Sequence, residues 1–150
     1  MLALRDAWGT AALVASVACV GTPTQTYPGP PLPPEKVVVL RETSEGAILA
    51  IDGVEAWGSS WSVMPGPHEL LVRFQIFTTA PNMNWTVWSY CWIALQTVAG
   101  ERYVTVVRMR KEIAPRISEE LNMEIGIADG DGILRGVPHS CVPKKPKLTD

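Results

Sequence analysis

Charge is sparse in this sequence and has no marked excess of either sign. Charged residues make up 19% of the 150 residues, below the roughly 25% usual for globular domains. The formal net charge is -2. Proteins that bind nucleic acid carry basic patches that neutralise phosphates. We therefore expect no nucleic-acid partner.

Catalytic and metal-binding motifs are also missing. The chain has two histidines and three well-separated cysteines, with no Cys-x-x-Cys, Gly-x-Ser-x-Gly or His-Glu-x-x-His motif. The run from Asp129 to Gly132 resembles the start of a calcium loop. Ser140, however, stands where such a loop needs glutamate, which favours a hairpin turn. We expect no enzyme activity, metal or cofactor, and we interpret His68 as a structural residue.

The first 18 residues have the composition of a signal peptide or membrane anchor. Ala7 to Val20 is apolar and uncharged, but it is shorter than the roughly 20 residues of a membrane span. It fits the apolar region of a secretory signal, with a buried core helix as the alternative. Val17-Ala18-Cys19 resembles the site at which bacterial lipoproteins receive acyl chains such as palmitate. We predict lipidation of Cys19; an ordinary cleavage after Ala18 is the alternative.

The other two cysteines form an even pair if Cys19 carries lipid. An exported compartment permits a disulfide between Cys91 and Cys141. Closing a loop of roughly 50 residues stabilises a fold by about 4 kcal/mol in the chain-entropy model. The alternative is two free thiols, with Cys91 acting as a small buried hydrophobe in a strand.

Proline is abundant, and its 13 residues cluster at the two ends of the chain. Residues 19–35 are predicted to be a Pro-rich tether that follows the lipid-attachment cysteine. In polyproline II geometry, at about 3.1 Å per residue, it would reach roughly 50 Å from Cys19 to Lys36. Residues 138–150 are predicted to be a disordered, basic, Pro-rich tail.

The segment between these ends, residues 36–137, has the pattern of strands. Leu70, Val72, Phe74 and Ile76 alternate with more polar residues from Glu69 to Thr78, which predicts a strand with one buried face. Further strands are predicted over 36–41, 47–51, 54–57, 61–64, 85–98, 102–109, 124–128 and 133–137.

Turn signals separate these strands. Asp52-Gly53 suits a type I′ turn, and Pro65-Gly66 predicts a turn in which the glycine takes a positive φ. Only Ala114 to Asn122 could be helical. The predicted fold is all-β: an antiparallel β-sandwich or small barrel of about 7–8 strands.

Aromatic residues supply the main functional signal. Trp88, Tyr90 and Trp92 share one face of a predicted strand, opposite Cys91 and its apolar neighbours. If the cysteine face is core, the three aromatic rings form an outward row that is typical of a partner surface. The alternatives are that the strand buries both faces or that the tether covers the row. Tyr27, in the tether, is a further candidate for partner binding.

Several short motifs, taken in order, resemble a known group of proteins. They are Tyr27 to Pro33, the strand from Lys36 to Leu40, Ile51-Asp52-Gly53, Pro65-Gly66-Pro67-His68 and Ala99 to Tyr103. Their order resembles small envelope lipoproteins of Gram-negative bacteria and is similar to PEGA-type surface β modules. The resemblance implies a β domain on the periplasmic face of a membrane, and it supplies no catalytic residues.

Two functions are consistent with these sequence features. The first is a non-catalytic, membrane-anchored envelope protein whose β domain binds or braces a larger periplasmic or membrane assembly. The second is a β-sandwich module that binds cell-wall or surface glycan.

The lipid anchor gives a direct test. We expect the membrane-extracted protein to begin at Cys19 and to carry acyl chains, because Val17-Ala18-Cys19 matches the processing site. Intact-mass spectrometry measures this. A mass equal to the unmodified chain from Met1 to Asp150 would contradict it.

Overall fold

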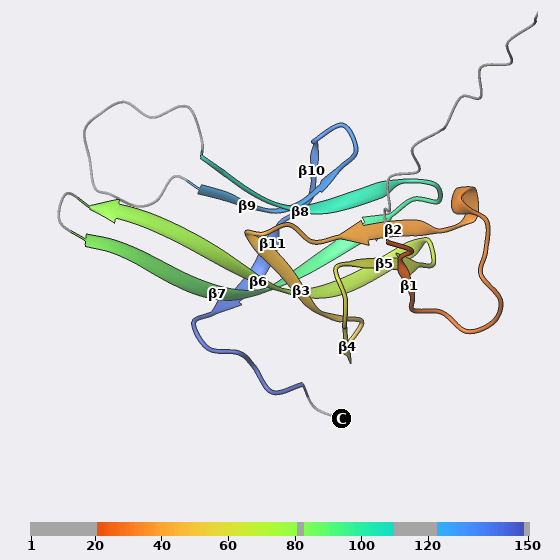
Figure 1. The fold of residues 1–150 in the computed structure, drawn as a ribbon, viewed down its shortest axis with the longest axis horizontal. Coiled ribbons are helices and arrows are strands. Elements are labelled where there is room, and N and C mark those ends of the chain that lie inside the picture. Colours follow the sequence, from red (N-terminus) through yellow and green to blue (C-terminus); the bar gives the residue numbers. More distant parts are fainter. Residues whose placement is uncertain (1–20, 81–82, 110–122, 149–150) are drawn as a thin grey trace, which may run out of the picture.

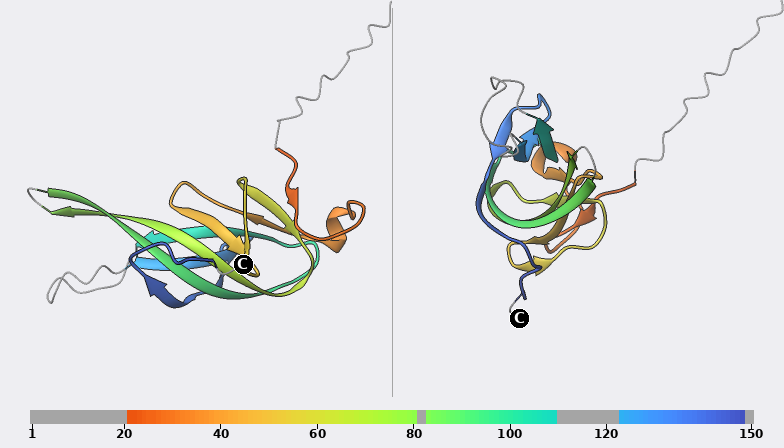
Figure 2. Two further views of the ribbon diagram at one scale, coloured as in Figure 1. Left: turned by 90° about the horizontal axis from the view of Figure 1, so that it is seen from below. Right: turned by 90° about the vertical axis from the view of Figure 1, so that its left-hand side faces the viewer.

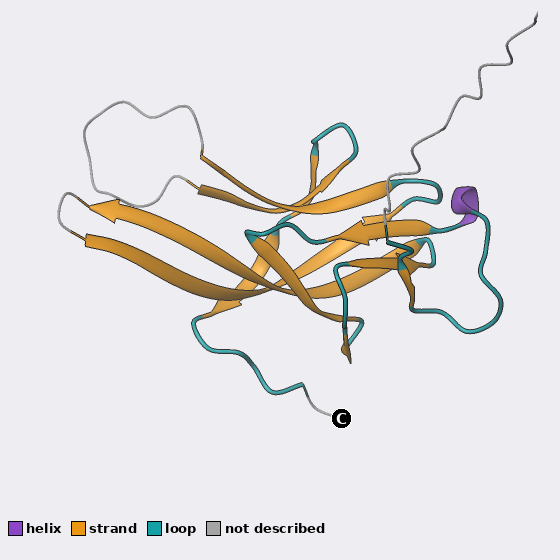
Figure 3. Cartoon of the chain, in the orientation of Figure 1, coloured by secondary structure: helices purple, strands orange, loops and turns teal. Residues whose placement is uncertain are grey.

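The computed structural model describes residues 21–80, 83–109 and 123–148. Within these ranges the chain forms eleven strands and one short 3-10 turn, η1 (Pro34–Lys36). Figure 3 shows how strands dominate the described residues. The predicted all-β class is therefore confirmed. The leader, Cys19 and the predicted helix over 114–122 lie outside the described residues.

The first of two sheets, sheet A, has six strands and lies uppermost in Figure 1. In spatial order they are β1 (Thr24–Gln25), β5 (Ser60–Val63), β2 (Val38–Arg41), β8 (Arg102–Met109), β9 (Met123–Asp129) and β10 (Leu134–Gly136).

The second sheet, sheet B, has five strands built around one long hairpin. In spatial order they are β11 (Pro138–Val142), β7 (Met83–Thr97), β6 (Gly66–Ala80), β3 (Gly46–Ile51) and β4 (Val54–Glu55). β6 and β7 pair along their whole length, from Gly66 opposite Thr97 to Ala80 opposite Met83. Figure 2 shows this hairpin curving around the interior of the molecule.

Two features differ from the predicted topology. Sheet A is mixed rather than wholly antiparallel, because β2 pairs in parallel with β8 and β1 pairs in parallel with β5. Parallel neighbours need a long crossover, and here the whole excursion through β3 to β7 separates β2 from β8. The two sheets are also not closed on each other, so the small barrel is wrong.

One apolar core lies between the sheets. Sheet B supplies Leu70, Val72 and Phe74 from β6, and all three are fully buried as predicted. Sheet A supplies Trp61 and Tyr103 to the same cluster. The period-two pattern therefore identified the buried face of β6 over these three positions, while Ile76 lies where side chains are not described.

Hydrogen bonds join the two sheets inside this core. The Thr105 hydroxyl on β8 donates to the Gly46 carbonyl on β3 at 2.7 Å. The same oxygen accepts from the Thr43 backbone N–H at 2.8 Å. Gly46 is required at this approach, because a Cβ there would lie 2.7 Å from the Thr105 Cβ and 3.1 Å from the Phe74 ring. The contact fixes the place where the chain first passes from sheet A to sheet B, between β2 and β3.

The predicted type I′ turn is confirmed, and so is the positive φ predicted for Gly66, although Gly66 is the first residue of β6. Asp52 and Gly53 join β3 to β4 with φ of 52° and 80°, as a type I′ turn requires. Gly66 has φ of 140°, a region that favours glycine. Its N–H donates to the Thr97 hydroxyl at 3.1 Å, which fastens the open ends of β6 and β7 together.

Both terminal arms contact the domain. β1 lies in the predicted tether, yet it pairs with β5, and the Thr26 N–H donates to the Ser62 carbonyl at 3.0 Å. This is an edge position, where proline-rich chain is tolerated. At the other end, the sequence placed the domain boundary after Val137. Instead β11 follows and pairs with β7, because proline at the start of an edge strand removes no needed hydrogen bond.

Phe74 tests the core assignment. Phe74→Ala should lower the free energy of unfolding by about 3–5 kcal/mol, because it leaves a cavity where a fully buried ring packs between the sheets. Chemical denaturation measures the change, with Gln96→Ala, an exposed position on β7, as the matched control. A loss of under about 1 kcal/mol for Phe74→Ala would contradict the assignment.

Candidate functional site

The aromatic row lies on the face of sheet B that points away from the core. Cys91, Ile93 and Leu95 of β7 are buried in the core cluster, so Trp88, Tyr90 and Trp92 project to the opposite side. Their cross-strand partners on β6 share that face and are Gln75, Arg73 and Leu71, in the same order. We call these six residues the aromatic face.

The side chains of the aromatic face become more exposed from Leu71 and Trp92 toward Trp88. Trp88 is 40% exposed, while Tyr90 and Trp92 are half-buried. Leu71, opposite Trp92, is only 2% exposed although it points away from the core. The middle of the β6–β7 hairpin thus buries residues on both of its faces, and the row opens to solvent toward Trp88.

Arg73 stacks on Trp88 at the solvent-exposed end of the aromatic face. Its guanidinium carbon lies 4.7 Å from the centre of the Trp88 ring, a cation–π arrangement. Its Nε is buried and has no hydrogen-bond partner among the described atoms. Sequence alone indicates only that Arg73 is a polar position on the strand, because the stacking depends on the register that sets Arg73 diagonally across from Trp88.

A disulfide fastens the edge of sheet B beside this face. Cys91 and Cys141 are bonded, and they are directly opposed partners of β7 and β11. The next residue, Val142, is the partner of Tyr90. The disulfide therefore links β11 to β7 of the long hairpin. β11 lies beside the aromatic row, because Val142 is opposite Tyr90.

The chain beyond β11 also contacts sheet B. Lys145 Nζ lies 3.5 Å from Glu55 Oε1 on β4, which forms the opposite edge of the sheet. Lys145, Lys147 and Leu148 border a shallow hollow with Val54. The segment predicted as a free tail thus includes a strand and a contact with β4.

Tyr27 does not join the aromatic face. It follows β1 at the edge of sheet A, and its hydroxyl accepts a hydrogen bond from the Leu32 N–H at 3.1 Å. The Gln25 amide donates to the carbonyls of Tyr27 and Gly29, each at 2.7 Å. Tyr27 therefore shapes its own proline-rich loop, and this loop lies beside sheet A and not over the aromatic row.

Two of the motifs that carried the resemblance meet in space. Asp52, from the Ile-Asp-Gly turn, contacts His68, from the Pro-Gly-Pro-His segment, with 2.7 Å between Oδ2 and Nδ1. His68 Nε2 lies 2.6 Å from the Met64 carbonyl, and Asp52 Oδ1 accepts from the Glu69 N–H at 2.9 Å. Both ring nitrogens face acceptors, which favours a structural role for His68 over that of a base.

The Asp129 loop is a closed turn. Asp129 Oδ1 accepts from the backbone N–H groups of Asp131 and Ile133, at 3.0 and 2.9 Å. Its Oδ2 accepts from Arg135 Nε at 2.6 Å. The buried carboxylate is fully engaged inside its own hairpin, as the hairpin interpretation predicted.

Across residues 21–80, 83–109 and 123–148, no three His, Cys, Asp or Glu side chains gather closely enough to hold a metal ion. Over the same part of the chain, no helix is long and apolar enough to cross a membrane.

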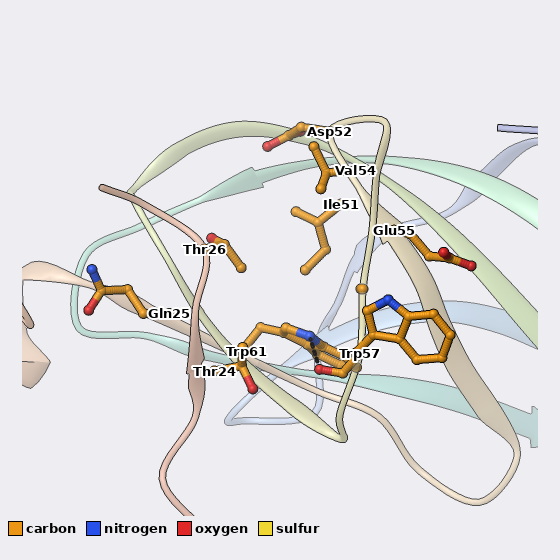
Figure 4. Close-up of a pocket in the computed structure, with 10 residues that line it drawn as sticks. Thr24, Gln25, Thr26, Ile51, Asp52, Val54, Glu55, Trp57 and Trp61 are labelled. Atoms are coloured by element: carbon orange, nitrogen blue, oxygen red, sulfur yellow. Dashed lines mark hydrogen bonds between the residues drawn. The ribbon is translucent and has the colours of Figure 1, made fainter. Parts of the chain in front are cut away.

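One hollow was not predicted from sequence. It has a volume of about 370 Å³ and lies between β1 and the hairpin of β3 and β4 (Figure 4). Ile51 and Val54 face the residues of β1 across it, and Trp61, the register partner of Thr24, lies beside β1. The Trp61 indole N–H donates to the Trp57 carbonyl at 3.2 Å, which anchors the loop between β4 and β5. No sequence pattern links β1 to β4, so only the parallel pairing of β1 with β5 reveals the hollow.

The Asp129 loop gives a pH prediction. The Arg135 hydrogen bond holds the pKa of the Asp129 carboxyl below its ordinary value near 3.8, against the opposing effect of burial. A depressed pKa adds stability that is present above this ordinary value and is lost as pH falls through the lower, folded-state value. Asp129→Asn should therefore destabilise the protein most near neutral pH, and the difference from wild type should shrink progressively below about pH 4.

Denaturant titrations at a series of pH values measure this, with exposed Asp131→Asn as the control. A wild-type advantage that stays constant down to pH 2 would show that the Asp129 carboxylate does not contribute through its charge.

Comparisons with known proteins leave the family open. No protein-family model, curated protein or solved structure matches this chain. The resemblance to envelope lipoproteins, carried by short motifs such as Pro65 to His68, therefore stays a prediction.

Proposed function

We propose that the protein is a non-catalytic, lipid-anchored protein of a bacterial cell envelope, and that its β domain binds a larger assembly through the aromatic face. The supporting observation is the cluster of Trp88, Tyr90 and Arg73 on the outside of sheet B. Tryptophan, tyrosine and arginine are the residues most enriched at the energetic centres of protein interfaces.

The arrangement of these side chains favours a protein partner. Stacking on Trp88 holds the Arg73 guanidinium in place, so binding would cost less side-chain entropy. Leu71 and Trp92 provide an apolar border that already excludes much of the water.

The exported location is supported by separate observations. The leader and Cys19 carry the lipoprotein pattern. The Cys91–Cys141 disulfide suits an oxidising compartment such as the periplasm. The engaged Asp52–His68 pair and Asp129 carboxylate favour a binding role over catalysis.

A glycan-binding module is the second candidate. A row of partly exposed aromatic rings along one strand is suited to stacking against sugar rings. However, the guanidinium of Arg73 already occupies one face of the Trp88 ring, the most exposed of the three. This occupancy makes the protein partner the better supported of the two.

Site-specific crosslinking tests the proposal. With a photo-crosslinking residue at Gln75, the cross-strand neighbour of Trp88, the full-length protein in its native membranes should form one dominant protein adduct. Trp88→Ala should weaken binding about 30-fold, the equivalent of a 2 kcal/mol interface centre, and remove the adduct. A probe at Gln96, at the far end of β7, serves as the position control.

The alternatives give different results. An adduct that persists at full yield in Trp88→Ala would contradict a role for the aromatic face. Retention of the wild type, but not of Trp88→Ala, on insoluble cell-wall polysaccharide would support the glycan module instead.

A further inference from the structure

Gly21 and the residues that follow it lie against one end of the domain. Thr24 and Gln25 are paired with β5, and Gly58 lies so close that a Cβ on it would be 3.3 Å from the Thr24 hydroxyl. Gly21 and Arg41 border the same shallow hollow as Gly58. Figure 2 shows the described chain beginning beside this end of the molecule.

This pairing shortens the link between Cys19 and the domain. The sequence predicted a free spacer of roughly 50 Å up to Lys36. Because β1 is pinned at Thr24, only five residue steps separate Cys19 from the first hydrogen-bonded strand. Five steps span at most about 17 Å in extended chain. A lipid on Cys19 would therefore hold this end of the domain close to the bilayer.

The end of the domain that the link would bring to the bilayer carries exposed apolar side chains. Trp57 is 74% exposed and Val54 is 71% exposed, the two highest values among the exposed large hydrophobic residues of the described chain. They belong to the strand and loop next to Gly58, and both border the hollow shown in Figure 4. In that view the Trp57 ring points away from β1. Tryptophan is favoured at the boundary between headgroups and acyl chains.

The loop that presents Trp57 is held in place from inside. The Trp57 carbonyl accepts a hydrogen bond from the indole N–H of Trp61, whose side chain is almost fully buried. On the other side, the Glu42 N–H donates to the Ser59 carbonyl at 3.1 Å. The exposed Trp57 ring therefore extends from a backbone segment that is hydrogen-bonded to the core residue Trp61 and to Glu42, which follows β2.

Cationic side chains flank the apolar pair. Arg41 is exposed and is the cross-strand partner of Ser60, three residues after Trp57. Lys145 and Lys147 border a hollow with Val54 on the other side. Glu55 is paired with Lys145, and Asp52 contacts His68. Arg41 and Lys147 are the cations of this group that do not neutralise Glu55, and they complement anionic lipid headgroups.

We infer that this region, consisting of Arg41, Val54, Trp57, Lys145 and Lys147 and here named the Trp57 patch, rests on the surface of an anionic bilayer. The inference depends on the proposed lipid anchor at Cys19 and adds the orientation of the domain. The acyl chains confine the domain to the membrane, Trp57 and Val54 enter the headgroup region, and the cations meet anionic lipids. The aromatic face, on sheet B, is then left for the partner.

Depth-dependent quenching tests this orientation. The full-length lipidated protein is reconstituted into phosphatidylethanolamine vesicles containing phosphatidylglycerol, with lipids brominated near the headgroup as quenchers. We expect these lipids to quench part of the tryptophan emission. Trp57→Phe should abolish the quenching, whereas Trp88→Phe, the matched control on the aromatic face, should leave it intact.

The outcomes separate the two proposals. Quenching that is unchanged in Trp57→Phe, or lost equally in Trp88→Phe, would overturn the Trp57 patch even when intact mass shows lipid on Cys19. A mass without lipid on Cys19, together with failure to sediment with vesicles, would overturn the anchor and with it this orientation. Replacing phosphatidylglycerol with phosphatidylcholine should reduce the quenching of lipidated wild type, and no reduction would contradict the role of Arg41 and Lys147.

Discussion

The arrangement of the two sheets depends on the hydroxyl of Thr105. Buried in the core, it bonds the backbone of both Thr43 and Gly46, so it fixes the point where the chain passes from β2 to β3. Leaving a buried backbone donor or acceptor unpaired costs about 1–3 kcal/mol. The absence of a side chain at Gly46 lets the two sheets meet closely enough for these bonds.

Packing then decides what each face of sheet B can do. The inner face is filled by Phe74 and its neighbours, and this fixes the register of β6 against β7. That register places Arg73 next to Trp88 on the outer face and sets Cys91 opposite Cys141 through β11. The aromatic face is thus a consequence of the core, which explains why its residues keep a defined geometry while remaining partly exposed.

Much of the β pattern could be predicted from the sequence, because it depends on local rules. Alternation along β6 identified the buried side of Phe74, and Asp52-Gly53 identified a type I′ turn. The parallel pairing of β2 with β8 could not be predicted, since it is decided by long-range packing. β11 was missed because proline at 138 and the basic residues after it are typical of a tail.

The site was predictable to a similar degree. The row of Trp88, Tyr90 and Trp92 followed from period two alone, but the stacked Arg73 and the buried Leu71 depend on neighbouring strands. Trp57 lies beside the first described residues because β1 pairs with β5. This pairing could not be predicted, since the proline-rich composition around β1 is typical of a free tether.

A protein partner that covers the aromatic face in the cell envelope would shield Trp88 from solvent there. Hydroxyl-radical footprinting of intact membranes and of the purified protein in detergent, read out by mass spectrometry at Trp88, tests it most directly. We expect Trp88 to be strongly protected in membranes and to become oxidised after purification from its partner. Equal oxidation of Trp88 in both preparations would contradict it.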